Sequence, residues 1–89
     1  MEVRDLVYID NYEAPFQNMI MCHLIADSNQ ELLEFVDKIN VNRKWIQHVG
    51  KYSEHFDICL SKKKLAIRFG AIEISPKELV GKMREKKEK

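Results

Sequence analysis

Two apolar runs define the first part of the chain. Residues 6–9 form a short run, and residues 19–26 form a longer one that only His23 interrupts. The short run has the pattern of a strand that is buried on both faces, and the longer run predicts a second strand. Residues 11–18 contain Pro15 and no helical period, so we expect a loop there. Because this loop is too short for a parallel crossover, the two strands should be antiparallel neighbours.

Two helices are predicted from capping boxes, in which a serine is followed three residues later by a glutamate. The first is Ser28 with Glu31, and the second is Ser75 with Glu78. The first helix should end near residue 40, and it carries an apolar stripe at helical spacing: Leu32, Phe35, Val36 and Ile39. The second should bury Leu79, Val80 and Met83 and then fray.

The middle of the chain is less regular. We interpret residues 43–49 as a strand that ends at Gly50, and residues 51–57 as a polar loop. A helix is predicted from about Ser61 to Phe69, with Gly70 as its C-terminal stop. Residues 71–74 should form one more short strand.

This order of elements, β-β-α-β-α-β-α, predicts an α/β fold: a single small domain with a mixed sheet of about four strands and three helices. Residues 1–83 would form the domain and residues 84–89 a charged tail. A right-handed crossover would make strand 43–49 parallel to strand 19–26. Asp27, His55 and Asp57 would then share the carboxyl edge of the sheet, where α/β domains bind ligands. Asp10 would lie at the opposite end.

Composition narrows the functional classes. The 89 residues carry a net charge of +1, which argues against a domain that coats nucleic acid by bulk charge. No apolar run approaches the roughly 20 residues that span a membrane, and we expect neither a membrane partner nor a signal peptide. Cys22 and Cys59 lie in apolar runs and should be reduced thiols, which predicts a cytoplasmic protein. A domain this small would gain stability as a homodimer.

Candidate chemistry gathers around residues 55–64. His55 and Asp57 alternate, so in an extended segment they project to one side and can act as a proton-transfer pair. Alternatively, Asp57 only caps the following helix. His23 is either a buried structural imidazole or a functional one, oriented by Asp27 or by a residue from the loop that carries His55. These four residues are also suitable metal donors, but they lack compact ligand spacing, so we predict no metal and no cofactor.

A basic segment follows directly. Ser61 begins the predicted helix, Lys62, Lys63 and Lys64 occupy its first turn, and Arg68 lies about one turn farther on. Lysines are unfavourable near the positive end of a helix dipole, and a bound anion would relieve that cost. The alternative is an ordinary solvated first turn. No glycine-rich phosphate loop is present.

Trp45 and Gln47 form a third candidate group. On a strand they would share one face and offer a stacking surface beside an amide, which suits a nucleobase. A tryptophan buried in the core is the alternative.

The residues also resemble a known family. The segments that carry the resemblance are Val7-Tyr8-Ile9-Asp10, Met21-Cys22-His23-Leu24-Ile25-Ala26-Asp27, Glu31-Leu32-Leu33-Glu34-Phe35, Trp45-Ile46-Gln47, His55-Phe56-Asp57-Ile58, Ser61-Lys62-Lys63 and Ala66-Ile67-Arg68-Phe69-Gly70-Ala71. They are similar to a family of small bacterial and phage domains, number 4031 in the domain-of-unknown-function series.

The resemblance implies no particular activity. The family commonly has a second acid where this chain has Asn11, so Asp10 is not expected to be part of an acidic metal pair. The family commonly has tyrosine where this chain has Phe56, so no essential phenol is expected there. It also commonly has an arginine near the position of Lys63 or Lys64.

Three functional hypotheses follow. The first is a binding domain for a phosphate-bearing ligand, either a nucleotide or a nucleic-acid end. Its lysines would hold the phosphate, while His23, Asp27, His55 and Asp57 shape the pocket and Trp45 stacks on a base. The second is a phosphoryl-transfer or hydrolytic enzyme, metal-assisted or metal-free, with His55 as acid or base and Asp57 or Asp27 orienting it. The third is a protein-interaction module without a small ligand.

Overall fold

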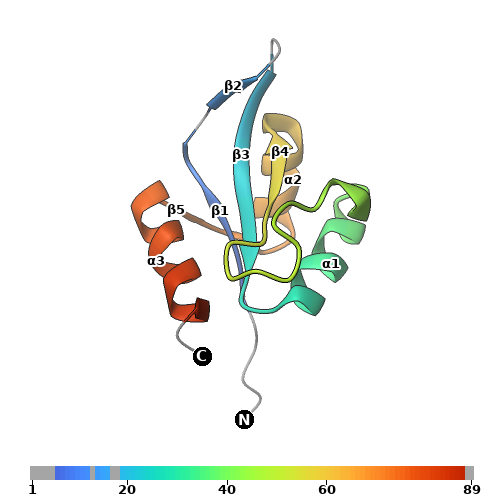
Figure 1. The fold of residues 1–89 in the computed structure, drawn as a ribbon. Helices are drawn as coiled ribbons and strands as arrows, with labels where there is room; N and C mark the ends of the chain where they lie inside the picture. Colours follow the sequence, from blue (N-terminus) through green and yellow to red (C-terminus); the bar gives the residue numbers. More distant parts are fainter. Residues whose placement is uncertain (1–5, 13, 17–18, 88–89) are drawn as a thin grey trace.

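The fold is a mixed sheet with three helices, as the α/β prediction requires (Figure 1). A computed structural model describes residues 6–12, 14–16 and 19–87. In chain order the elements are β1 (Val7–Asp10), β2 (Ala14–Phe16), β3 (Met19–Ala26), α1 (Asn29–Lys38), the 3-10 turn η1 (Arg43–Trp45), β4 (Phe56–Cys59), α2 (Leu60–Arg68), β5 (Ile72–Ile74) and α3 (Pro76–Lys87).

The long strand β3 organises the sheet. Strands β1 and β2 both pair with it antiparallel, along one edge, and β4 pairs antiparallel along the other edge. Strand β5 is parallel to β1. The predicted antiparallel pairing of the first two apolar runs is confirmed. Strand β2 lies where the sequence predicted only loop; its Pro15 is tolerated because β2 is an edge strand.

The predicted strand at 43–49 is wrong. Residues 43–45 form η1 instead, where the Asn42 side chain accepts a hydrogen bond from the Lys44 backbone N–H at 2.9 Å. Only one bridge follows, between Gln47 and His55. Strand β4 begins within the segment that was predicted to be a loop. Its apolar residues Phe56 and Ile58 alternate with more polar ones and are buried on one face of the sheet.

The helices cover the two faces of the sheet unequally. Helices α1 and α2 lie on one face and α3 on the other (Figure 1). The larger core lies under α1 and α2 and contains Val7, Ile9, Cys22, Leu24, Ala26, Leu32, Phe35, Val36, Ile39, Phe56, Ile58, Ala66 and Ala71. The smaller core, under α3, consists of Tyr8, Ile25 and Leu79. Because side chains alternate along a strand, His23 of β3 is on the α3 face.

Two details of α3 differ from the sequence prediction. Val80, which was predicted to be buried, is 45% exposed. Leu79 is buried, and Met83 packs against the smaller core, as predicted. The helix also continues to Lys87 rather than fraying after Met83. The reason is a long-range contact: the Lys86 ammonium donates to the Ala26 carbonyl at 3.0 Å and holds the last turn against β3.

Both predicted helix starts are confirmed. The Ser28 hydroxyl accepts from the Glu31 N–H at 3.1 Å. Ser75 and Glu78 form a reciprocal capping box, with distances of 3.0 and 3.1 Å. In the part of the chain that the structure describes, no helix combines the length and apolar character needed to cross a membrane.

Candidate metal centre

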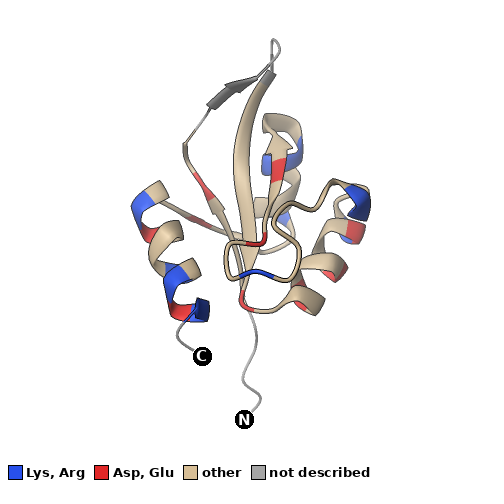
Figure 2. Cartoon of the chain, viewed as in Figure 1, with Lys and Arg blue, Asp and Glu red and all other residues tan. Residues whose placement is uncertain are grey.

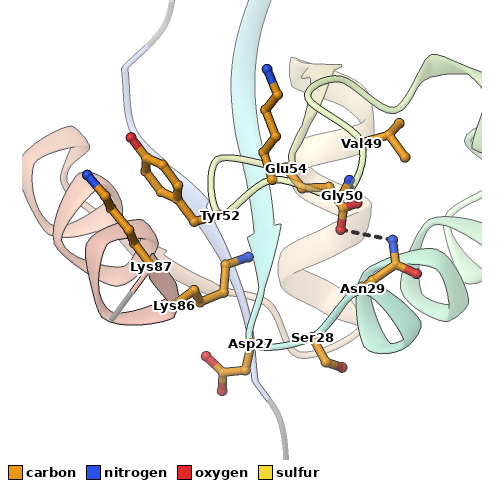
Figure 3. A pocket seen from close by; sticks show the side chains of 10 residues that line it. Asp27, Ser28, Asn29, Val49, Gly50, Tyr52, Glu54, Lys86 and Lys87 are labelled. Carbon is orange, nitrogen blue, oxygen red and sulfur yellow. Dashed lines mark hydrogen bonds between the residues drawn. The ribbon is translucent and has the colours of Figure 1, made fainter. Parts of the chain in front are cut away.

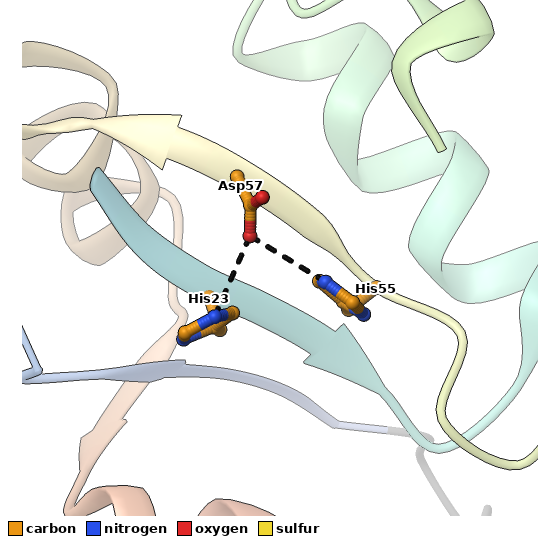
Figure 4. Close-up of side chains that lie close together, drawn as sticks. All are labelled: His23, His55 and Asp57. Atoms are coloured by element: carbon orange, nitrogen blue, oxygen red, sulfur yellow. Dashed lines mark ion pairs between the residues drawn. The ribbon is translucent and has the colours of Figure 1, made fainter. Parts of the chain in front are cut away.

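Three predicted site residues meet on the α3 face of the sheet. His23 in β3 pairs with Asp57 in β4, and His55 immediately precedes β4. One ligand atom from each residue lies within 4.8 Å of the other two. Figure 4 shows both imidazole rings directed at the Asp57 carboxylate. The predicted convergence of these side chains is therefore present in the structure.

Asp10 orients the His23 ring. The His23 backbone N–H donates to Asp10 Oδ1 at 2.9 Å, and His23 Nδ1 lies 2.7 Å from Asp10 Oδ2. The Asp10 side chain is 1% exposed and the His23 side chain 34%. The hydrogen bond that the His23 ring donates to Asp10 is the main reason that the pKa of His23 is raised above its ordinary value.

His55 is oriented by the backbone. Its Nδ1 lies 2.8 Å from the Ser53 carbonyl oxygen, which can only accept a hydrogen bond, so Nδ1 carries the hydrogen. The opposite ring atom, Nε2, faces Asp57 Oδ1 at 3.5 Å. His55 is buried, so its ring is held firmly in this direction.

Asp57 presents one satisfied and one unsatisfied oxygen. Its Oδ2 accepts from Gln47 Nε2 at 2.6 Å. Its Oδ1 is buried and has no hydrogen-bond partner among the described residues, although His23 Nε2 lies at 3.6 Å. When both histidines are neutral, Oδ1 faces two nitrogen lone pairs. Three electron-rich atoms then point at one another, and a bound cation or proton would relieve their repulsion.

The orienting acid differs from the sequence prediction. Asp27, expected beside His23, instead accepts a hydrogen bond from the Leu6 backbone N–H at 2.8 Å. It lies four residues beyond His23, about 13 Å along an extended strand. Asp10 takes its place because β2 lengthens the hairpin, so that β1 ends opposite the middle of β3.

The predicted lysine site is not assembled around the histidines. Lys62 Nζ donates to the Ile39 carbonyl at 2.9 Å, and the buried Lys63 pairs with Glu73 at 2.7 Å. Consecutive helical residues point about 100° apart, which separates these two side chains. Both belong to α2, whose basic residues are blue in Figure 2. This helix lies on the face of the sheet opposite α3, whereas the His23 cluster is on the α3 face.

The remaining basic and capping residues of α2 are also separate from the cluster. Lys64 and Arg68 are exposed. The Ser61 hydroxyl lies 3.2 Å from the Cys59 sulfur. The sequence prediction that Lys62–Lys64 and the histidines form one pocket is therefore wrong.

Trp45 and Gln47 do not form the predicted shared face, because η1 replaces the strand. Trp45 is 60% exposed, and the Lys44 ammonium lies 5.0 Å from the centre of its ring. Gln47 contacts Asp57 instead and so supports the cluster.

Two further aromatic rings border the cluster. The Tyr12 ring is parallel to His23 with centroids 6.3 Å apart, and the His48 ring lies edge-on to His55 at 5.2 Å. His48 has a left-handed backbone, with φ 56°, which is unusual for a residue other than glycine. Its Nδ1 lies 2.8 Å from the Ser53 hydroxyl.

Fold and site together define a small α/β domain with two histidines and one carboxylate converging on the face of its sheet. The chain belongs to the family described as Protein of unknown function (DUF4031), whose family model matches residues 7–86. The resemblance seen in the sequence is thus confirmed. No curated protein and no solved structure matches the chain.

Proposed function

We propose that this protein binds one divalent transition-metal ion and uses it to activate water for hydrolysis. The ligands would be His23 Nε2, His55 Nε2 and Asp57 Oδ1. One observation carries the proposal: a buried carboxylate oxygen without a hydrogen-bond partner among the described residues faces two imidazole nitrogens.

The spacing of the three atoms suits a metal ion. Ligand atoms bind Zn²⁺ at about 2.0–2.2 Å, so two ligands in a tetrahedral site lie about 3.3 Å apart. Asp57 Oδ1 lies 3.6 Å from His23 Nε2 and 3.5 Å from His55 Nε2. Side-chain shifts of a few tenths of an ångström would bring these two pairs to the ideal separation. The ligand atoms of the two imidazoles lie within 4.8 Å of each other and would have to approach to the same separation when an ion binds.

The surrounding hydrogen bonds support the same reading. Histidine ligands of metals usually donate their second N–H to a carboxylate or a backbone carbonyl. Asp10 serves this purpose for His23, and the Ser53 carbonyl serves it for His55. Both Nε2 atoms are thereby directed at one point before any ion arrives.

Three protein ligands favour a catalytic rather than a structural ion. Structural zinc sites are normally closed by four protein ligands, whereas catalytic sites keep one position for water. A bound Zn²⁺ lowers the pKa of that water to about 7, so a hydroxide nucleophile is available near neutral pH. Because this step needs no oxidant or reductant, we favour Zn²⁺ and hydrolysis over redox chemistry.

A metal-free acid–base site is the second candidate, supported by the raised pKa of His23. In that case His23 is protonated and its Nε2–H points toward Asp57 Oδ1.

We also retain the proposal that the protein binds a phosphate-bearing ligand. The lysines of α2 do not support it, because two of them already have partners within the protein. If neither a metal nor a small ligand binds, the remaining hypothesis is a protein-interaction module.

Metal titration of a protein without a histidine tag tests the proposal. Co²⁺ serves as a visible substitute for Zn²⁺, and calorimetry gives the Zn²⁺ affinity. We expect the wild-type protein to bind one equivalent of metal. His55→Gln and Asp57→Asn should each weaken metal binding by at least about 100-fold, which is more than the loss of a residue that only hydrogen-bonds to a ligand usually costs. His48→Gln is the control, because His48 is a neighbouring histidine outside the proposed ligand set. Equal binding by all four proteins would refute the site.

A further inference from the structure

A second feature of the structure is an open pocket of 650 Å³ near the end of β3 (Figure 3). Its walls come from the β3–α1 connection, from residues 49–54 and from the last turn of α3. The lining residues are Asp27, Ser28, Asn29, Val49, Gly50, Lys51, Tyr52, Glu54, Lys86 and Lys87. We call this the lysine pocket. Its volume falls within the range of small-molecule sites, about 300–1,000 Å³.

The two acids of the lysine pocket already have neutral partners. Asp27 Oδ2 accepts from the Leu6 N–H. Glu54 is 4% exposed and accepts from the Asn29 side chain at 2.9 Å and from the Gly50 N–H at 3.0 Å. Glu54 therefore ties its loop to α1, Asp27 ties the end of β3 to the residue before β1, and neither acid forms a close ion pair with the lysines.

The three lysines form no close ion pairs with the acids of the pocket. Lys86 is half-buried and donates to the Ala26 carbonyl; burial lowers its pKa, and the more distant charges of Glu54 and Asp27 offset only part of this effect. The Lys87 ammonium lies 5.3 Å from the centre of the Tyr52 ring. In the described part of the chain, no carboxylate lies within 4.0 Å of the ammonium groups of Lys51, Lys86 or Lys87. A partly desolvated cation gains most from an anion that supplies the missing charge.

The rim of the lysine pocket adds apolar surface. Val49 is 65% exposed and Tyr52 is 43% exposed. Two large, exposed side chains beside a cationic floor suit a ligand that has an organic part as well as an anionic group. The Ser28 oxygen accepts from Glu31 N–H, which leaves its hydroxyl hydrogen free to donate.

We propose that the lysine pocket binds the phosphate group of a nucleotide-sized organic phosphate. Lys86 and Lys51 would contact the phosphate oxygens, and Tyr52 and Val49 would contact the organic part. A phosphate monoester is favoured over a carboxylate because its greater charge complements several cations at once. This proposal does not rest on the metal centre, which it neither uses nor requires.

The test is a titration of ¹⁵N-labelled, metal-free protein followed by amide chemical shifts. The probes are adenosine monophosphate, inorganic phosphate and adenosine at constant ionic strength. We expect saturable shifts at Ser28, Gly50 and Lys51 with adenosine monophosphate, weaker ones with phosphate, and none with adenosine. Shifts that grow without saturating, or equal responses to adenosine, would overturn the proposal.

Variants assign the binding to particular lysines. Lys86→Met and Lys51→Met should each weaken binding by about tenfold, as expected for loss of one charge-assisted contact. Lys64→Met is the matched control, because Lys64 is an exposed lysine on α2, across the sheet. Lys86→Arg should restore part of the affinity. Because Lys86 also ties α3 to β3, the melting temperature of the Lys86→Met variant is measured in parallel. If that variant unfolds, the Lys51→Met variant decides the outcome. Unchanged affinity in Lys51→Met, or an equal loss in Lys64→Met, would overturn the proposal.

Discussion

Asp10 and His23 face each other across the β1–β3 pair and are joined twice, by the backbone N–H at 2.9 Å and by the ring at 2.7 Å. This double contact occurs where regular pairing stops. The Ile9–Leu24 pair is regular, and regular pairing resumes with Ala14 and Met21. The Asp10 carboxylate therefore replaces a missing strand contact and at the same time fixes the direction of an imidazole.

Replacing Asp10 with asparagine should affect both stability and metal binding. We expect a loss of about 1–3 kcal/mol in the free energy of unfolding, because a buried charge-assisted hydrogen bond is weakened. Metal affinity should fall by about 10–100-fold, as for other outer-shell partners of histidine ligands. Urea denaturation and calorimetry measure the two effects. Asp37→Asn is the control, because Asp37 is exposed and pairs only with Arg43, and it should change neither quantity appreciably.

The apo-protein should lose stability as pH rises through the pKa of His23. The folded-state pKa of His23 is raised, mainly by the hydrogen bond that its ring donates to Asp10. Protonation therefore favours the folded state: the contribution is complete below the unfolded value of about 6.5 and disappears as pH passes the raised folded value. Denaturation at a series of pH values checks this, and His23→Gln should remove this component. A stability that instead rises across this window would contradict the assignment.

Metal binding should show the opposite dependence on pH. A proton and a metal ion compete for His23 Nε2, so affinity should increase as the same proton leaves. Zn²⁺ affinity measured by competition with a chelator between pH 6 and 8 tests this. A flat profile would mean that His23 is not a ligand.

Asp57→Asn should separate function from stability. With its Oδ1 buried beside two nitrogen lone pairs, Asp57 is unfavourable in the metal-free protein when His23 is neutral. An asparagine amide can donate to one of those nitrogens and still accept from Gln47. At high pH with a chelator present, we expect the variant to be at least as stable as the wild type, by up to about 1 kcal/mol. In the separate metal titration, the same variant should bind metal at least about 100-fold more weakly. A clear loss of stability under those conditions would argue against the repulsion.

Phe56→Ala tests the assignment of β4 to the core. Phe56 is fully buried, and truncating a buried phenylalanine costs about 3–5 kcal/mol. Phe69 is 52% exposed, so Phe69→Ala is a matched control that should cost much less. Chemical denaturation of both variants measures the difference. Similar losses would mean that Phe56 does not have the central position described.

Local signals in the sequence predicted the helices and the longest strand well. The serine–glutamate pairs at 28–31 and 75–78 are short-range chemistry, and both caps form. The apolar run at 19–26 coincides with β3, which pairs with other strands along both of its edges. Strand β4 was missed because its apolar residues alternate with polar ones and follow a polar loop.

The site was predicted only in part because its geometry is non-local. The sequence indicated His23, His55 and Asp57 by residue type, and the structure brings them together. It could not assign Asp10 to His23, since that contact depends on β2 extending the hairpin. It grouped Lys62 with Lys63 because they are consecutive, whereas the helix directs them to different partners.

The bridge between Gln47 and His55 closes residues 47–55 into one lobe, through backbone hydrogen bonds of 2.9 and 3.1 Å. The neck of this lobe carries a histidine of the proposed metal centre, and its tip lines the lysine pocket. The two proposed sites are therefore joined by one short, hydrogen-bonded segment. If an occupant at one end shifted this lobe, thermodynamic reciprocity would require each occupant to change the affinity of the other by the same factor.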